Sequence, residues 1–238
     1  MTKLILALNV ATPEKAKELF RTVGNQVDLY KIGIDLWTQV GPQLVKELVA
    51  GGAGVFLDLK FADIPSVVAK AVTAATDLGV KMLTVHTMGG AEMLLAATKA
   101  AKNRAKELGI EPPLILGVTV LTSLDRAGLF QITGFSQEVE NRVLALSELA
   151  QSMGCNGVIA SPKEIKVIKK RCGPKFIVVT PGIRLQPGGK DDQARFLTPQ
   201  EAQMAGADYI VVGRPIYEAK EPLKVIAEIK QQLSLGNI

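Results

Sequence analysis

The sequence predicts a single-domain α/β protein, a closed (β/α)8 or TIM barrel, from three observations. Eight short apolar runs rich in β-branched residues recur along the 238 residues, and segments with helical periodicity separate them. No proline- or serine-rich linker divides the chain, so residues 1–238 are expected to form one catalytic domain. Strands that alternate with helices indicate a parallel sheet with helical crossovers, and eight such units indicate a closed barrel.

The predicted strands follow in order: Leu4–Leu8, Leu29–Ile34, Val55–Leu59, Met82–His86, Leu114–Val118, Gly157–Ala160, Phe176–Thr180 and Tyr209–Gly213. Several intervening helices carry start signals. Thr12 precedes a proline at the first helical position, and Ser161 and Thr198 each open a capping box. The longer connection from Thr119 to about Ser136 is expected to hold a short extra helix or loop. A doubly wound open sheet is the alternative, but no GxGxxG follows the first strand.

Composition narrows the classes of function. The N-terminal apolar run is too short for a signal peptide or a membrane span, so a cytoplasmic protein with no membrane partner is expected. The densest basic run, residues 163–175, alternates with apolar residues at helical spacing, and no aromatic residue interleaves with it. It indicates a solvated helix face rather than a nucleic-acid surface. The net charge of +5 is equally compatible with a small anionic substrate.

Metal chemistry is disfavoured by the residue inventory. His86 is the single histidine, so HExxH and multi-histidine metal sites cannot be built. A Ser-His-Asp triad remains possible, although no GxSxG elbow accompanies it. We therefore expect chemistry without metal or cofactor, and interpret His86 as a hydrogen-bonded structural residue more readily than as one that orients a substrate.

The segment Asp58–Pro65 is the most informative motif. It places Lys60 between two carboxylates, Asp58 and Asp63, at the end of a buried strand. Because side chains alternate along a strand, Asp58 and Lys60 are expected on the same side. A neighbouring carboxylate favours the ammonium form of lysine, which suits chemistry that builds negative charge on carbon and then needs a proton. A surface ion pair of little energetic consequence is the plainer interpretation.

Polar residues also end most of the other predicted strands, where barrel enzymes place their catalytic groups. In chain order these are Asn9, Lys31, Asp58 with Lys60, His86, Thr119 with Thr122, Ser161, Arg184 and Arg214. Ser161 is expected only to cap a helix. The glycine-rich loop after the seventh strand and the Gly213-Arg214 pair after the eighth predict a phosphate site, since backbone amides at a helix start and a forked guanidinium both favour anions. The glycine-rich loop could close over the phosphate as a lid.

These motifs, in this order and spacing, closely resemble the orotidine 5'-monophosphate decarboxylase family, and the resemblance covers nearly the whole chain. The matching segments are Leu6–Asn9, Lys31–Gly33, Asp58–Pro65, Leu121–Ser123, Pro181–Arg184, Gln193 and Val212–Arg214. The Asp-x-Lys-x-x-Asp pattern is shared with sugar-phosphate enzymes of a wider superfamily, but the Ile64-Pro65 that follows it is similar to the orotidylate branch.

The resemblance implies catalytic roles for four residues. In this family the substrate is orotidine 5'-monophosphate, and Lys60 would protonate C6 of its pyrimidine ring after carbon dioxide leaves. Asp58 would lie beside the substrate carboxylate, and Lys31 would pair with Asp58 and reach the ribose. Asp63 crosses the interface of a homodimer to complete the neighbouring site. The substrate-binding residues implied are Asn9, Thr122, Ser123, Arg184, Gln193, Gly213 and Arg214.

Asn9 departs from the family, which ordinarily has aspartate there. The amide keeps a hydrogen-bonding group but removes a negative charge, so we expect weakened binding rather than lost chemistry. Two other functions stay open. A sugar-phosphate lyase of the same superfamily would need magnesium, and a pyrimidine-nucleotide binding protein would retain the site without turnover.

Overall fold

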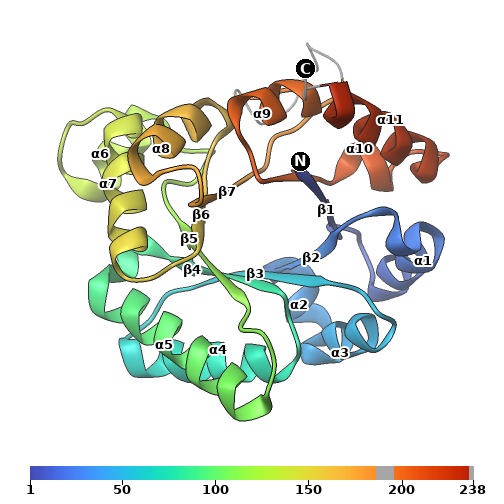
Figure 1. Ribbon diagram of the computed structural model, residues 1–238, viewed down its shortest axis with the longest axis horizontal. Helices are drawn as coiled ribbons and strands as arrows, with labels where there is room; N and C mark the ends of the chain where they lie inside the picture. The colour runs from blue at the N-terminus through green and yellow to red at the C-terminus, as the bar shows by residue number, and fades with distance from the viewer. Residues whose placement is uncertain (186–195, 236–238) are drawn as a thin grey trace.

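Eight parallel strands close into one barrel in the computed structural model, which describes residues 1–185 and 196–235 (Figure 1). Each strand pairs with its neighbours in chain order, and β8 closes the ring against β1. The strands are β1 (Lys3–Ala7), β2 (Leu29–Gly33), β3 (Val55–Phe61), β4 (Met82–His86), β5 (Leu114–Val118), β6 (Gly157–Ile159), β7 (Ile177–Thr180) and β8 (Tyr209–Val212). The predicted (β/α)8 barrel is confirmed.

The predicted strand ends differ from the observed ones by one or two residues in six of the eight strands. Most predicted ends run slightly long because the following turn or helix takes over apolar residues. Ile34 opens a helix, for example, and Gly213 caps another. The third strand is the exception: it continues past Leu59 to Phe61, into the motif that carries Lys60. Its extension takes part of the predicted site into the sheet.

Helices surround the barrel on the outside (Figure 1). The α-helices are α1 (Pro13–Val23), α2 (Ile34–Val40), α3 (Pro42–Ala50), α4 (Pro65–Asp77), α5 (Gly90–Leu108), α6 (Arg126–Thr133), α7 (Val139–Ser152), α8 (Ile165–Cys172), α9 (Pro199–Ala205), α10 (Arg214–Tyr217) and α11 (Pro222–Leu235). In the described part of the chain, 3-10 turns supplement them at η1 (Gly24–Gln26), η2 (Thr87–Gly89) and η3 (Pro162–Glu164). The extra element expected between Thr119 and Ser136 is α6.

The predicted helix starts are present. Thr12 accepts a hydrogen bond from the Lys15 amide, and Thr198 forms its capping box with Glu201. At Ser161 the backbone amide donates to the Glu164 carboxylate, at 2.8 Å.

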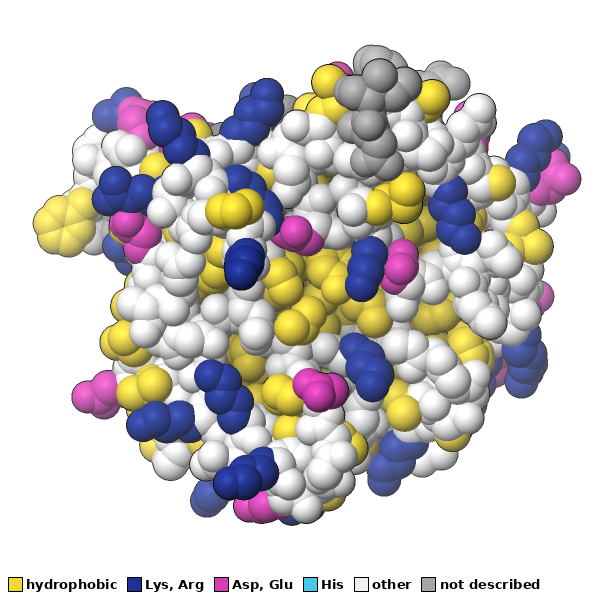
Figure 2. All heavy atoms as spheres, in the orientation of Figure 1, with side chains coloured by type: hydrophobic (Ala, Val, Ile, Leu, Met, Phe, Trp, Pro, Cys, Tyr) yellow, Lys and Arg dark blue, Asp and Glu magenta, His cyan; other side chains and the backbone are white. Residues whose placement is uncertain are grey.

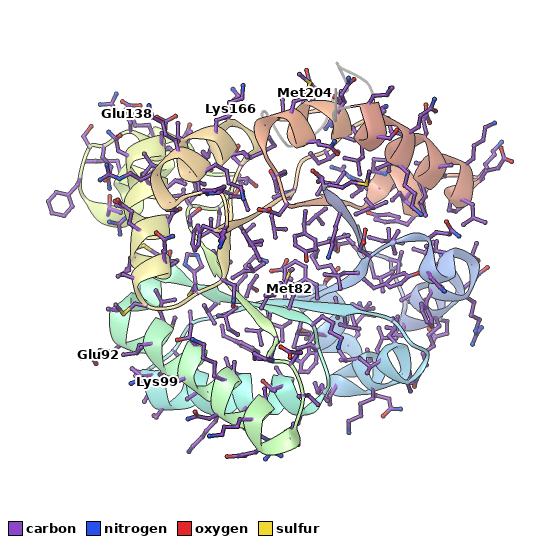
Figure 3. All side chains as sticks on the ribbon, viewed as in Figure 1. Met82, Glu92, Lys99, Glu138, Lys166 and Met204 are labelled. Atoms are coloured by element: carbon purple, nitrogen blue, oxygen red, sulfur yellow. The ribbon has the colours of Figure 1, made fainter. Side chains whose placement is uncertain are left out.

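The basic run forms a helix face, as predicted. Ile165 and Ile168 are buried on α8, whereas Lys166 is exposed and points away from the barrel in Figure 3. On the face seen in Figure 2, apolar side chains gather at the centre, and Lys and Arg are interspersed with Asp and Glu around them. Basic side chains are therefore not gathered into a single patch on that face.

Near the amino ends of several strands, polar side chains accept hydrogen bonds from backbone amides. In three βα units a carboxylate or amide accepts from the backbone N–H of a neighbouring strand: Asp28 from Leu4, Asn156 from Ile115, and Asp208 from Val178. Lys169 also pairs with Asp208, at 2.6 Å. These side chains are committed to the backbone, so polar groups available for chemistry have to be sought at the opposite, carboxyl ends of the strands.

The interior of the barrel is an apolar layer of six buried side chains: Ile5, Leu29, Phe56, Met82, Leu116 and Val179. Met82 is labelled inside the ring of strands in Figure 3. Because strand side chains alternate, the residue two positions further along each strand also points inward, one layer nearer the carboxyl end. On β2, β3 and β4 those residues are Lys31, Asp58 and Thr84. The apolar layer is thus the floor beneath a polar layer.

Candidate active site

A cavity of about 920 Å³ opens at the carboxyl ends of the strands, above this floor. Eight of the eleven predicted site residues line it: Asn9, Lys31, Asp58, Lys60, Thr122, Arg184, Gly213 and Arg214. These residues come from six different strands or the loops after them, and only the closed barrel brings them together.

Asp58 is held between two lysines. Its Oδ1 lies 2.9 Å from Lys60 Nζ and its Oδ2 lies 3.4 Å from Lys31 Nζ. Lys31 Nζ also donates to Asn9 Oδ1, at 3.4 Å. The side chains of Asp58 and Lys31 are only 13% and 11% exposed, whereas that of Lys60 is 38% exposed and reaches the cavity. The predicted contact between Asp58 and Lys60 is therefore present, and its partial burial separates it from an ordinary surface pair.

The charge state of Asp58 follows from its neighbours. Burial by itself would raise the pKa of this carboxyl, but the charges of Lys31 and Lys60 and hydrogen bonds from Lys60 and Thr84 outweigh it. The pKa of Asp58 is consequently held below its ordinary value, and the carboxylate is ionised at neutral pH. The centre of the site is a fixed negative charge with an ammonium group on each side.

Lys60 has an unusual backbone. Its φ of 53° makes it the one non-glycine residue with a positive φ among those described. The pairing of β3 with β4 also shifts between Leu57 and Phe61, so the strand bulges at the Asp58–Pro65 motif. Regular alternation, from which the sequence placed Asp58 and Lys60 on one side, is interrupted here; the side chains still meet, but by way of a bulge.

The surroundings of Gly33 explain why the Lys31-Ile32-Gly33 motif ends in glycine. A Cβ at this position would lie 2.9 Å from Asp35 Oδ1 and 3.3 Å from Lys31 Nζ. A side chain would crowd the lysine, so the glycine leaves room for the amine to turn toward Asp58 and Asn9.

Two arginines form the other end of the cavity. Arg214 opens α10 directly after Gly213, and Arg184 follows β7. The Arg184 guanidinium lies over the Phe196 ring, 4.9 Å from its centroid. This end of the cavity has the charge and the helix start that suit an anion. Gln193, the further predicted phosphate contact, lies outside the described residues.

Two predicted site residues do not line the cavity of the single chain. Asp63 is exposed, and its Oδ1 accepts a hydrogen bond from the Ile64 amide, at 2.6 Å. Ser123 is also exposed, next to Thr122, which does line the cavity. Both lie on loops beyond the strand ends, where neither alternation nor barrel geometry fixes the direction of a side chain.

Sequence reasoning missed Thr84. This fully buried residue of β4 donates to Asp58 Oδ1, at 3.0 Å, and accepts from the Lys60 amide, at 2.9 Å. Its position two residues after Met82 was the available signal. His86, two residues further on, accepts from the Met88 amide through Nδ1 and is not among the cavity-lining residues. Burial, with a smaller effect of the Lys60 charge, holds the pKa of His86 below its ordinary value.

Within residues 1–185 and 196–235, no group of three or more His, Cys, Asp or Glu side chains is arranged to hold a metal ion. No helix in the same ranges is both long enough and apolar enough to span a bilayer.

Fold and site together define the class: a (β/α)8-barrel protein with a charged site at the carboxyl ends of its strands. Residues 2–229 match the sequence model of the Orotidine 5'-phosphate decarboxylase / HUMPS family, and the chain belongs to this family.

Curated relatives and solved structures agree with this assignment. The chain is 44% identical to the Orotidine 5'-phosphate decarboxylase of Heliobacterium modesticaldum, over 98% of this chain and 96% of the relative. It is also 44% identical to that of Legionella pneumophila, over 97% and 99%. The crystal structure of Orotidine 5'-phosphate decarboxylase from Lactobacillus acidophilus superimposes with a TM-score of 0.88 at 32% identity, covering 98% of this chain and 99% of the other.

Proposed function

We propose that this protein decarboxylates orotidine 5'-monophosphate to UMP and carbon dioxide, the last step of de novo pyrimidine biosynthesis. The observation that carries the proposal is the Asp58 carboxylate held between Lys60 and Lys31 on the floor of the cavity. Relatives that cover nearly the whole chain are named for the same reaction. Residues 1–238 would act as one catalytic domain.

Lys60 is the proton donor in this proposal. The bond between C6 and the carboxyl carbon breaks, carbon dioxide leaves, and the electron pair stays on C6 in the plane of the ring. The carbonyl groups of the pyrimidine delocalise such a pair poorly, so a positive charge must be supplied by the protein. The Lys60 ammonium, which reaches the cavity, stabilises the carbanion and transfers a proton to C6. Water then returns a proton to the amine.

Asp58 and Lys31 support this transfer. Asp58 holds the Lys60 ammonium in place through the 2.9 Å contact, and Lys31 balances the second carboxylate oxygen. Asp58 also places a negative charge beside the substrate carboxylate, whose loss would relieve the repulsion. Lys31 and Asn9, which hydrogen-bond to each other, face the ribose.

Three groups bind the phosphate in this proposal: the side chains of Arg184 and Arg214 and the backbone at Gly213. Gln193, from the same loop as Arg184, joins them. Thr122 contacts the ribose-phosphate side and Ser123 the pyrimidine. The phosphate lies far from C6, so its binding energy assists the reaction by fixing the ring over Lys60. The predicted lid, the glycine-rich loop, lies mostly outside the described residues.

We further propose a homodimer in which Asp63 completes the site of the partner. Asp63 is exposed, and the nearby residues Ile64 and Val67 are 63% and 44% exposed. Ile34, which opens α2 directly after the neighbouring strand β2, is 64% exposed. Apolar residues of this size on one rim favour a protein contact. A hybrid test addresses both points: Lys60→Ala and Asp63→Asn chains, each impaired alone, are refolded together in equal amounts.

In the hybrid dimer the chain with Asp63→Asn keeps its own Lys60 and receives an intact Asp63 from its partner. Activity should therefore return to about a quarter of the wild-type value, because half of the dimers are hybrids with one intact site in two. No gain above the two separate variants would contradict the shared site, and a monomer in sedimentation would contradict the dimer.

The direct test follows the ultraviolet absorbance of orotidine 5'-monophosphate with purified protein in excess EDTA. Loss of the substrate band with wild type, but not with Lys60→Ala, is the expected result. A magnesium-dependent sugar-phosphate lyase would leave the substrate band unchanged with or without EDTA. Nucleotide binding without turnover, in wild type and in Asn9→Asp alike, would identify a binding protein. A cytoplasmic location and the absence of nucleic-acid and membrane partners stay predictions.

A further inference from the structure

Thr84 occupies a singular place in the pairing of β3 with β4. Leu57 pairs with Leu83 and Phe61 with Val85, so the three residues 58–60 of β3 lie opposite Thr84 alone. Two residues of β3 are therefore in excess at this point, which makes a bulge larger than the usual one with a single extra residue. The amide of Lys60 donates to the Thr84 side chain, at 2.9 Å.

The Thr84 hydroxyl is used in both directions. A hydroxyl has one hydrogen to donate, and that of Thr84 goes to Asp58 Oδ1, at 3.0 Å, while its oxygen accepts from the Lys60 amide. The same Asp58 oxygen accepts from Lys60 Nζ, at 2.9 Å. The hydrogen bonds thus run from the Lys60 amide through Thr84 and Asp58 back to the Lys60 ammonium.

This ring of hydrogen bonds begins and ends at Lys60, whose backbone has an unfavourable conformation. The positive φ of Lys60 is unfavourable for a non-glycine residue and persists only where the surroundings hold it. Thr84 is completely buried, so water cannot replace its hydroxyl at the Lys60 amide. The direction in which the Lys60 side chain leaves the backbone depends on this φ.

We propose that Thr84 is a positioning residue. Its hydroxyl holds the bulged backbone of Lys60 and the Asp58 carboxylate, so that the Lys60 ammonium lies within reach of the substrate carbon that it protonates. The inference rests on the proposed function. Thr84 does not line the cavity, so it acts through Lys60 and Asp58 rather than on the substrate.

Isosteric replacement isolates the hydroxyl. Thr84→Val keeps the shape and removes both hydrogen bonds, whereas Thr84→Ser keeps the hydroxyl and loses a methyl group. Thr98→Val is the matched control, because Thr98 is also buried and its hydroxyl hydrogen is shared between the carbonyls of Leu95 and Met153, away from the cavity. If Thr84→Val does not fold, Thr84→Ala compared with Thr84→Ser gives the same contrast.

The experiment measures kcat and KM for orotidine 5'-monophosphate and the Tm of each variant, with crystal structures of wild type and Thr84→Val. We expect Thr84→Val to lose roughly 10- to 100-fold in kcat with KM changed less, as for a catalytic group displaced by about 1 Å. Thr84→Ser should stay within a few-fold of wild type, and Thr98→Val should lower Tm with kcat unchanged. In the crystal structure of Thr84→Val, Lys60 should leave its positive φ or its ammonium should move from Asp58.

Either of two results overturns the inference. One is a Thr84→Val enzyme with wild-type kcat; the other is a Thr84→Val structure in which the Lys60 backbone and ammonium are unmoved. An inactive wild type would instead count against the proposed function, and the comparison of the two structures would still decide whether Thr84 positions Lys60.

Discussion

Replacing Asp58 by asparagine removes the one negative charge between two ammonium groups and leaves the shape of the side chain. The Asp58 contacts, at 2.9 and 3.4 Å, are each worth of order 5 kcal/mol of Coulomb energy at an effective dielectric constant of about 20, before desolvation is subtracted. Lys31 is the buried partner, at 11% exposure, whereas the pair with Lys60 is discounted because that side chain is more exposed.

Removing one partner of a buried ion pair lowers the free energy of unfolding by about 3–5 kcal/mol. Because Lys60 is partly exposed, we expect Asp58→Asn to lower it by about 2–3 kcal/mol. For a chain of this size that corresponds to a Tm lower by about 5–10 °C. Activity should fall more steeply, by roughly 100-fold in kcat/KM, since Lys60 loses the group that fixes its ammonium. Asp77→Asn is the control: Asp77 pairs with Arg104 at the surface, and its loss should change stability by less than about 0.5 kcal/mol.

The stability difference between wild type and Asp58→Asn should depend on pH in a definite direction. Because the pKa of Asp58 is held below its ordinary value, its stabilisation is complete above the unfolded-state pKa, about 4, and is lost as the pH falls through the lower folded-state pKa. Urea unfolding of wild type and Asp58→Asn should therefore differ by a constant amount near neutral pH and converge below about pH 4. A difference that is small at pH 7, or that grows in acid, would refute the electrostatic account.

Three further predictions concern other parts of the cavity. Asn9→Asp should raise kcat/KM by about 5-fold, because an ion pair with Lys31 replaces a hydrogen bond to an uncharged amide, and an unchanged value in steady-state assays would contradict this. Gly33→Ala should lower kcat/KM at least ~10-fold, because its Cβ would crowd Lys31 Nζ at 3.3 Å; a fully active variant would show that the amine has room to spare. Arg214→Ala should raise KM by roughly 30-fold or more through loss of a charged phosphate contact, whereas Arg171→Ala, on the surface of α8 and paired with Glu148, should leave KM unchanged.

The barrel was predictable because its determinants are local. Each strand is an apolar, β-branched run, and alternation along β2 and β3 places Lys31 and Asp58 one layer above Leu29 and Phe56. The sequence therefore located the cavity, its lysines and its arginines.

The bulge at Lys60 was not predictable, because it depends on the register between two strands. Within Met82–His86, Thr84 looks like any strand threonine, and only the pairing of Leu57 with Leu83 and of Phe61 with Val85 places it opposite three residues. Asp63 and Ser123 lie on loops past the strand ends and are exposed in the single chain, so a pattern in one sequence could not orient them.

Chemical rescue of Lys60→Ala tests most directly whether an ammonium group at this position drives the reaction. The variant should lose at least ~10⁴-fold in kcat, the range expected when a general acid and a charge-stabilising group are removed together. Added methylammonium should then restore part of the rate in proportion to its concentration, and tetramethylammonium, which has no proton to give, should not. A Lys60→Ala enzyme within about 10-fold of wild type would contradict the assignment of Lys60 as the proton donor.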